Sequence, residues 1–205
     1  MEEDAALIDR RVYVIDDDDP LARATIRRML TGSGVYSEEF ESAGDFLQKQ
    51  PDLPMGCILL NLRLHGIGGL RLLKQLKDRG VPDPVIMISG QVDVPEAVEA
   101  IKSGAIDFIE KPFRKERLLD VVNKAFDLVR SHQQRENIQR SVNFSGREQQ
   151  VLNGLAEGAT NKLIARQLGI SSRTVEMHRA KIMRKLGVKT AAHAVLVARE
   201  AGFLG

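Results

Sequence analysis

The N-terminal part of the chain alternates between two hydrophobic patterns. Short apolar runs rich in β-branched residues occur at residues 12–15, 57–60, 85–88 and 106–109, with a weaker candidate at 35–40. Amphipathic stretches lie between them at residues 21–30, 43–48, 70–77, 95–102 and 115–129. Strands that alternate with helices at this spacing predict βαβ units. We therefore expect an α/β domain over residues 10–130, with a five-stranded, doubly wound parallel sheet covered by helices on both faces.

The C-terminal part contains only short helical patterns. Ser145 and Glu148 match a capping box at the start of the first helix. Thr160 caps a second helix that ends at Gly169, a third starts near Ser171 and runs to about residue 186, and a fourth spans roughly residues 191–201. The pattern predicts a small all-α domain of four helices over residues 143–205.

The segment that joins the two domains, residues 131–142, is polar, contains no Gly or Pro and is rich in helix formers. Either the preceding helix continues into it as a semi-rigid linker, or the segment is loose. We favour a partly helical linker.

The charge of the chain is divided unevenly between these parts. The 205 residues carry a net charge of +2, but residues 1–130 hold 18 Lys and Arg against 23 Asp and Glu, whereas residues 131–205 hold 12 against 5. A small domain with this excess of basic residues predicts a polyanionic partner. Trp is absent and only nine aromatic residues occur, so a base-stacking platform for single strands is not expected.

The composition also bears on the compartment. No apolar run approaches the roughly 18 residues needed to cross a bilayer, and the N-terminal stretch MEEDAALIDRR is acidic and lacks an apolar signal core. The single cysteine, Cys57, cannot form an internal disulfide or a zinc site, and it is most simply a small buried hydrophobe. We expect a cytoplasmic protein without a membrane segment.

Four consecutive aspartates, Asp16 to Asp19, directly follow the first predicted strand. In an open parallel sheet, binding sites form at the carboxyl ends of the strands. Oxygen ligands at such a position suit Mg²⁺. The same carboxylates also suit a solvated acidic turn that caps the helix at residues 21–30, because carboxylates favour a helix N-terminus. The run alone leaves both interpretations open.

Other strand ends add an amide, a hydroxyl and an ammonium group, which are those of Asn61, Ser89 and Lys111. Here the sequence resembles the receiver domain of bacterial response regulators of the FixJ/NarL family, which has a flavodoxin-like fold. The resemblance rests on the stretches VIDDD (14–18), GCILLNLRLHGIGGL (56–70) and ISGQVDVPEAVEAIKSGAIDFIEKPF (88–113).

The resemblance implies a role for each position. In that family the acidic pair, here Asp16 and Asp17, holds Mg²⁺, and an aspartate on the third strand accepts a phosphoryl group from a histidine kinase. A strand-four Ser or Thr, here Ser89, moves to bind the phosphoryl oxygen, and a lysine, here Lys111, pairs with it. The aromatic switch residue falls on Phe108. The Lys-Pro bond at 111–112 is expected to be cis, and residues 95–109 are the expected dimerisation segment.

The chain departs from the family at the phosphoacceptor position, which is occupied by Asn61. An amide is a poor nucleophile, and it removes one negative charge from the Mg²⁺ site. Four residues later the expected proline is His65, which we interpret as an exposed loop histidine rather than a ligand or an alternative acceptor. Either the protein is an atypical receiver that works without phosphorylation, which we slightly favour, or Asn61 was introduced to lock the unphosphorylated state.

Two further hypotheses concern control and chemistry. A small molecule or a partner protein that binds the first domain would gate the regulator without any phosphate, because a partner that prefers one state shifts the equilibrium. A phosphohydrolase or phosphotransferase is the competing class, but Asn61 removes the obvious nucleophile and no Ser/His or Cys/His pairing stands out. We expect a regulator and not an enzyme.

The C-terminal helices contain a helix-turn-helix pattern, in which two short helices flank a tight turn with glycine and the second helix is basic. A structural four-helix bundle has the same periodicity, but the basic charge favours DNA. The string REQQVLNGLAEGATNKLIARQLGISSRTVEMHRAKIMRKLGV (147–188) resembles the LuxR-type DNA-binding domain along its whole length.

Helical spacing divides the recognition helix into two faces. One face is expected to pack on the bundle, and consists of Val175, His178, Ile182 and Leu186. We expect the opposite face to meet base edges in the major groove through Glu176, Met177 and Ala180. The residues expected to hold phosphates or support these contacts are Asn161, Lys162, Arg173, Thr174, Lys181, Arg184 and Lys185. For Asn161, support of the helix start is an equally good interpretation.

Together these features predict a bacterial transcription regulator that binds double-stranded promoter DNA and works with RNA polymerase. One small recognition helix reads few bases, so the active form is expected to be a homodimer. The apolar stripe at the end of the first domain is a second candidate for its interface, although that stripe also suits a core-facing helix. A cognate histidine kinase is the implied input.

Overall fold

The computed structural model describes residues 10–91 and 93–204 and divides into two compact units between Ser131 and His132. Each unit is described by itself. The acidic N-terminal stretch considered above as a possible leader lies largely outside the described residues. No helix in the described part of the chain combines the length and apolarity needed to cross a membrane.

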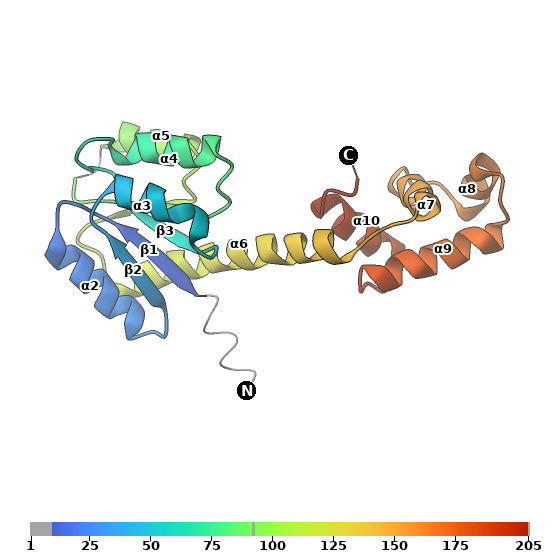
Figure 1. Cartoon of the computed structure of the whole chain (residues 1–205), viewed down its shortest axis with the longest axis horizontal. Coiled ribbons are helices and arrows are strands. Elements are labelled where there is room, and N and C mark those ends of the chain that lie inside the picture. The colour runs from blue at the N-terminus through green and yellow to red at the C-terminus, as the bar shows by residue number, and fades with distance from the viewer. Residues whose placement is uncertain (1–9, 92, 205) are drawn as a thin grey trace. The chain divides into compact units, whose positions relative to one another are not determined.

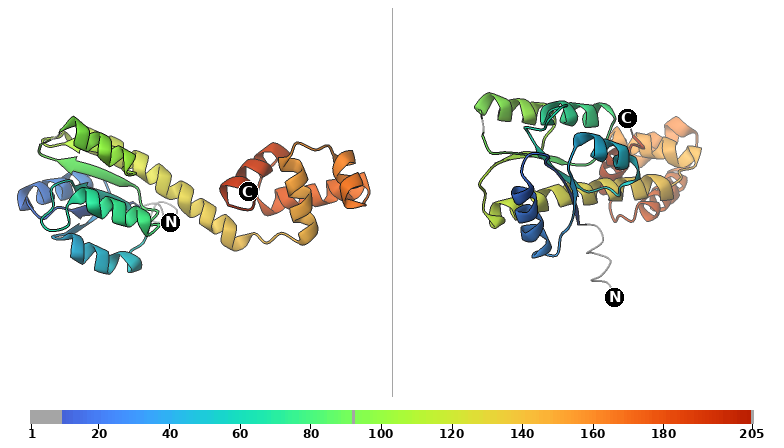
Figure 2. Two further views of the ribbon diagram at one scale, coloured as in Figure 1. Left: turned by 90° about the horizontal axis from the view of Figure 1, so that it is seen from above. Right: turned by 60° about the vertical axis from the view of Figure 1, so that its left-hand side comes forward.

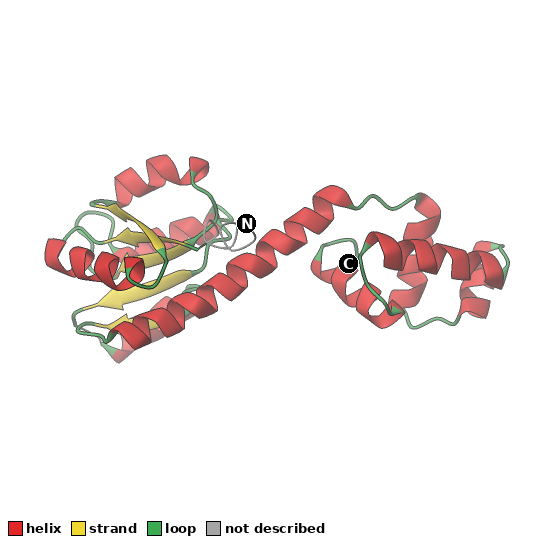
Figure 3. Cartoon of the chain, turned by 90° about the horizontal axis from the view of Figure 1, so that it is seen from below, coloured by secondary structure: helices red, strands yellow, loops and turns green. Residues whose placement is uncertain are grey.

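The first unit is built on a five-stranded parallel sheet in the order β2-β1-β3-β4-β5. Its strands are β1 (Arg11–Ile15), β2 (Tyr36–Phe40), β3 (Cys57–Asn61), β4 (Val85–Ser89) and β5 (Asp107–Glu110). β3 and β4 are buried along their whole length, which explains why they occur in the sequence as continuous apolar runs. Figure 3 shows these strands enclosed between helices. The expected fold class is confirmed.

Helices cover both faces of this sheet. One face carries α3 (Ala43–Lys49), α4 (Gly69–Asp78) and α5 (Val94–Lys102), and the other carries α2 (Pro20–Thr31) and the first turns of α6 (Lys115–Ser141) (Figure 1). A short 3-10 helix, Gln50–Asp52, follows α3. The two apolar layers on either side of the sheet leave the carboxyl ends of the strands free to carry polar groups.

Helix α6 extends beyond the amphipathic stretch at residues 115–129 from which it was predicted. Its first part buries residues such as Leu118, Val122 and Phe126 against the sheet. The polar stretch expected to be partly helical is helical through Ser141. In the second unit, Ile138 packs on the core there. A single apolar contact of this kind is too sparse to produce a helical period in the sequence.

The second unit is a cluster of crossing helices (Figure 2). These are α7 (Gly146–Ala156), α8 (Asn161–Leu168), α9 (Ser172–Lys185) and α10 (Ala191–Glu200). Both hydrogen bonds of the expected capping box, between Ser145 and Glu148, are present. A Cβ at Gly154 would lie 2.8 Å from Ile164 Cγ1, so the close approach of α7 and α8 requires glycine at this position.

Candidate functional site

The predicted pocket forms at the carboxyl edge of the sheet, where β1, β3 and β4 end and the cis Lys111-Pro112 bond follows β5. Asp16 is completely buried there. Its Oδ2 atom lies 2.6 Å from Lys111 Nζ, and its Oδ1 atom accepts a hydrogen bond of 2.8 Å from Asn61 Nδ2. The buried carboxylate of Asp16 is therefore paired with one ammonium group and one amide.

The orientation of the Asn61 amide follows from its two partners. Its Oδ1 atom accepts a hydrogen bond of 3.3 Å from the backbone N–H of Arg63, so its amino group faces Asp16. A carboxylate at position 61 has no donor to offer Asp16 and would place a second negative charge beside it. Asn61 therefore helps to satisfy the buried charge of Asp16, a role that an aspartate cannot take without a cation or a proton.

The second member of the acidic pair, Asp17, contacts His65. Asp17 Oδ2 accepts a hydrogen bond of 2.7 Å from the His65 backbone N–H, and Oδ1 lies 3.2 Å from His65 Nδ1. The His65 side chain is 78% exposed, which confirms the expected loop position. Its contact with Asp17 was not predicted, because the two residues lie on different loops.

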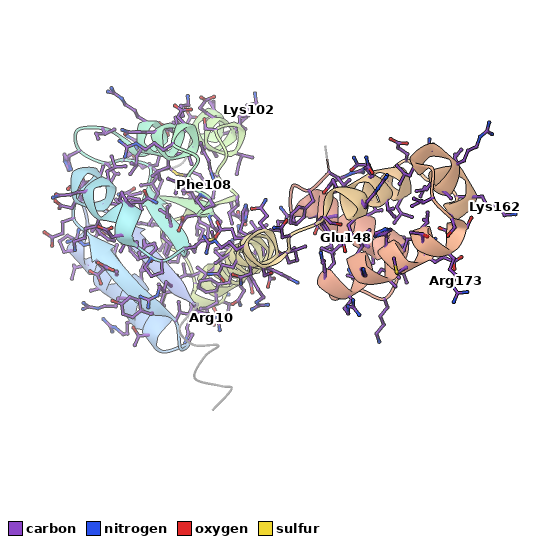
Figure 4. All side chains as sticks on the ribbon, turned by 45° about the vertical axis from the view of Figure 1, so that its right-hand side comes forward. Arg10, Lys102, Phe108, Glu148, Lys162 and Arg173 are labelled. Atoms are coloured by element: carbon purple, nitrogen blue, oxygen red, sulfur yellow. The ribbon has the colours of Figure 1, made fainter. Side chains whose placement is uncertain are left out.

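The two expected switch residues, Ser89 and Phe108, have different surroundings. Ser89 is completely buried, and its hydroxyl donates a hydrogen bond of 2.7 Å to the carbonyl oxygen of Gln91. Phe108, labelled in Figure 4, is half-buried and packs against the core on the face of α3, α4 and α5. Burial raises the pKa of the Cys57 thiol, which agrees with its interpretation as a small core residue.

The recognition helix α9 has the two faces expected from its spacing. Val175 and Ile182 are completely buried, and Leu186 is nearly so. The opposite face is exposed along its length and consists of Arg173, Glu176, Met177, Ala180 and Arg184. Figure 4 shows Lys162 and Arg173 at one end of this unit, with both side chains pointing away from its core. The surface is basic with an exposed Met177, a combination that suits phosphates around a base-reading centre.

Comparison with known proteins identifies both units. Residues 12–123 match the response regulator receiver domain, and residues 142–198 match the bacterial regulatory proteins of the luxR family. The chain belongs to the FixJ/NarL family of response regulators. It is thus a two-component DNA-binding transcription regulator.

Similarity to individual family members extends over nearly the whole chain. The transcriptional regulatory protein FixJ of Bradyrhizobium diazoefficiens is 38% identical over 198 residues, covering 94% of this chain and 96% of that protein. FixJ of Azorhizobium caulinodans is 41% identical over 196 residues, covering 93% and 92%. The crystal structure of full-length FixJ from B. japonicum matches with a TM-score of 0.58 at 38% identity, covering 95% of this chain and 98% of that one.

Receiver domains generally bind Mg²⁺ at the phosphorylation site, and in this receiver the Asp16 member of the expected acidic pair is held by internal partners. Both carboxylate oxygens of Asp16 and the Oδ2 atom of Asp17 accept hydrogen bonds, whereas Asp17 Oδ1 is buried without a hydrogen-bond partner and lies 3.2 Å from His65 Nδ1. Within residues 10–91 and 93–204, no group of three or more His, Cys, Asp or Glu residues is placed to hold a metal. A cation at this edge would compete with Lys111 and Asn61 for Asp16, but not for Asp17 Oδ1.

Arg23 is a pocket residue that the sequence interpretation missed. It is 6% exposed, its guanidinium donates to the backbone carbonyl oxygen of Asp16, and it lies 3.3 Å from Glu41. It therefore fixes the loop that carries the aspartates. A signal was present, because Arg23 shares a helical face with the buried Ile26 and Leu30.

Lys185, expected at the DNA surface, has two internal partners that the sequence interpretation did not predict. Its Nζ atom lies 2.7 Å from Glu148 Oε2 and 2.7 Å from the carbonyl oxygen of Asn143. Burial raises the pKa of Glu148, but the hydrogen bonds from Lys185 and Ser145 outweigh burial, and the pKa lies below its ordinary value. This ion pair ties the end of α9 to the start of α7, and the phosphate contact of Lys185, whose side chain is 37% exposed, stays a prediction.

Two more residues of the expected set have internal partners. The Thr174 hydroxyl lies 2.8 Å from the hydroxyl of Ser171, at the start of α9. The Asn161 amide contacts Glu176 and Arg179 on α9. Among the described residues, the other basic members of the set form no side-chain hydrogen bond or ion pair, and these are Lys162, Arg173, Lys181 and Arg184. The phosphate contacts of the whole set stay predictions.

Proposed function

We propose that this response regulator binds promoter DNA without phosphorylation at position 61. The observation that carries the proposal is the Asn61 amide, which donates to the buried Asp16 while Lys111 pairs with the same carboxylate. Phosphoryl transfer to a receiver needs a carboxylate nucleophile and a cation to bring it together with the phosphoryl group. Asn61 supplies neither the nucleophile nor the negative charge. We infer that Mg²⁺ binds weakly and that any cognate histidine kinase does not transfer phosphate to this residue.

The proposal is tested on the full-length protein by measuring operator affinity before and after incubation with acetyl phosphate and Mg²⁺. Equal affinities are expected, because position 61 forms no acyl phosphate. An increase in affinity that accompanies a stable phosphoryl adduct would contradict the proposal. The operator affinity of the purified protein also distinguishes a natural Asn61 from an introduced one. A natural phosphorylation-independent receiver binds its operator as purified, whereas a receiver locked in its unphosphorylated state does not.

For DNA recognition we propose that some residues on and near α9 contact base edges and that others contact phosphates. Glu176, Met177 and Ala180 read base edges in the major groove, where Glu accepts from cytosine N4 and Met or Ala contacts a thymine methyl group. Lys162, Arg173, Lys181 and Arg184 hold phosphates and set the register. All of these residues except the half-buried Lys181 are exposed on the basic unit, which supports this division. The site of action is promoter DNA in the cytoplasm, with RNA polymerase as the partner in transcription, and the protein is a regulator and not an enzyme.

The active form is proposed to be a homodimer. Helix α5 exposes three apolar side chains at helical spacing, Val94, Val98 and Ile101, and Val94 is 73% exposed. They lie in or next to the segment 95–109 through which family members are expected to dimerise. An exposed apolar stripe of this kind is typical of an interaction surface.

Control by a partner protein or a small molecule is the second candidate. A groove of about 470 Å³ lies beside Lys111 and Pro112, and its apolar lining includes Leu21 and Met29. Leu21 is 81% exposed. A ligand in this groove would adjoin the lysine that pairs with Asp16, so it could bias the receiver without any phosphate.

A further inference from the structure

Asn161 lies where the first helix of the helix-turn-helix meets the recognition helix. It is the first residue of α8, directly after the N-cap Thr160. Its Nδ2 atom donates a hydrogen bond of 3.4 Å to Glu176 Oε1, and its Oδ1 atom accepts a hydrogen bond from the guanidinium of Arg179. Glu176 and Arg179 are three residues apart on α9, so one amide bridges two neighbouring side chains of opposite charge.

The amide group suits this place because it is a donor and an acceptor at once. Only an amide side chain offers an N–H to a carboxylate and a carbonyl oxygen to a guanidinium in the same plane. The two partners fix which end of Asn161 faces which residue. Both ends are therefore engaged inside the protein, which argues against the phosphate contact that is one interpretation of this residue.

The consequence concerns Glu176. It is exposed on α9, and a long exposed side chain that is free to rotate loses conformational freedom when it contacts a base. A side chain already held by a neighbour loses less, and a contact held in place discriminates better between bases. We propose that Asn161 is a positioning residue that holds Glu176 for base reading. The proposal rests on the base-reading role of Glu176 proposed above.

The test uses the full-length protein and a set of operators that differ by one base pair at each position. Glu176→Ala first identifies the base pair that Glu176 reads, as the position where discrimination is lost. Asn161→Ala is expected to lower discrimination at that same base pair by about 3- to 10-fold, a fraction of what a good bidentate base contact provides. The double variant should discriminate no worse than Glu176→Ala alone, because coupled residues are not additive.

The variant Asn161→Asp distinguishes a loss of positioning from a loss of folding. A carboxylate at the first turn of a helix favours the helix, so this variant should fold at least as well as the wild type. It keeps an acceptor for Arg179, but it replaces the donor to Glu176 with a like charge. We expect the same loss of discrimination as in Asn161→Ala, with unchanged thermal melting.

Lys162→Ala is the matched control, because Lys162 is the next residue on α8 and is exposed. It should weaken all operators alike and reduce the slope of log K against log salt by about 0.9. If Asn161→Ala behaves in this way, Asn161 is a phosphate contact and the inference is overturned. If Glu176→Ala changes the preference and neither Asn161 variant does, the positioning role alone is overturned. If Glu176→Ala leaves the preference unchanged, the base-reading role fails and the inference fails with it.

Discussion

The pocket of the receiver unit and the recognition surface of the helical unit use charge in opposite ways. In the pocket, the carboxylates of Asp16 and Asp17 face nitrogens of the same unit at 3.2 Å or less, and Asp16 is completely buried. On α9, Arg173 and Arg184 are exposed on the face opposite the core. A carboxylate that is paired internally, as that of Asp16 is, gains less from an ion, whereas exposed like charges gain from a polyanion. The comparison favours the proposal that the exposed basic surface of the helical unit binds a polyanion.

The difference between the pocket and the recognition surface is tested most directly by placing the phosphoacceptor aspartate at position 61. Asn61→Asp should take up a phosphoryl group from acetyl phosphate with Mg²⁺, and phosphorylation should shift its self-association equilibrium further towards the dimer. The reason is that Asp16, Asp17, Ser89 and Lys111 are all in place, and the new carboxylate removes the donor that now satisfies Asp16. Sedimentation with and without acetyl phosphate measures the shift.

Asn61→Ala is the control for this change, because it also removes the donor but adds no nucleophile. It should neither take up phosphate nor change its self-association when acetyl phosphate is added. If Asn61→Asp is phosphorylated but keeps its original mass in solution, the link between the pocket and self-association has been lost. Control by a partner would then become the better hypothesis.

A second change tests the internal ion pair of the helical unit. Lys185→Ala leaves the buried Glu148 without its cation and should lower the free energy of unfolding by about 1–3 kcal/mol. Because the pKa of Glu148 is lowered in the folded state, this pairing stabilises the wild type above the ordinary pKa of Glu and is lost as the pH falls through the folded-state value. Thermal melting between pH 3 and pH 7 should show that the variant loses this part of the pH dependence. An unchanged melting curve would return Lys185 to the set of phosphate contacts.

A third change tests the exposed surface. Arg184→Ala should weaken binding to all operators alike and reduce the slope of log K against log salt by about 0.9, because one phosphate contact is removed. Met177→Ala should instead change the preference at one base pair and leave the slope unchanged. Titrations at several salt concentrations distinguish the two effects. A flat salt dependence of the wild type would argue against the phosphate contacts as a group.

The smallest effect is expected at His65. His65→Ala removes one side-chain contact to Asp17; the Asp17 side chain is only 10% exposed, but the histidine is 78% exposed, and solvent screens such a contact to about 0–1 kcal/mol. The backbone hydrogen bond from residue 65 remains. Unfolding in denaturant should therefore give nearly the wild-type free energy. A loss of several kcal/mol would show that His65 is a structural part of the pocket.

The sequence predicts most of the fold because buried parallel strands and amphipathic helices have distinct periods. It also predicts which residues meet at the pocket, since the strand ends of a parallel sheet share one edge. It does not predict which side chains form hydrogen bonds or ion pairs with each other. The contact of His65 with Asp17 joins two loops, and the pair of Lys185 with Glu148 joins residues far apart in the chain. A basic residue on α9 has the same appearance in the sequence whether it faces a phosphate or a buried carboxylate.

The central claim, that the receiver pocket has no working acceptor, is tested most directly by intact-mass measurement of the wild-type protein after incubation with acetyl phosphate and Mg²⁺, with peptide mapping of any adduct. The Asn61 amide, held between Asp16 and the backbone of Arg63, predicts no phosphoryl adduct at or near residue 61. A labile phosphoryl group mapped to Asn61 or its neighbours would contradict the claim.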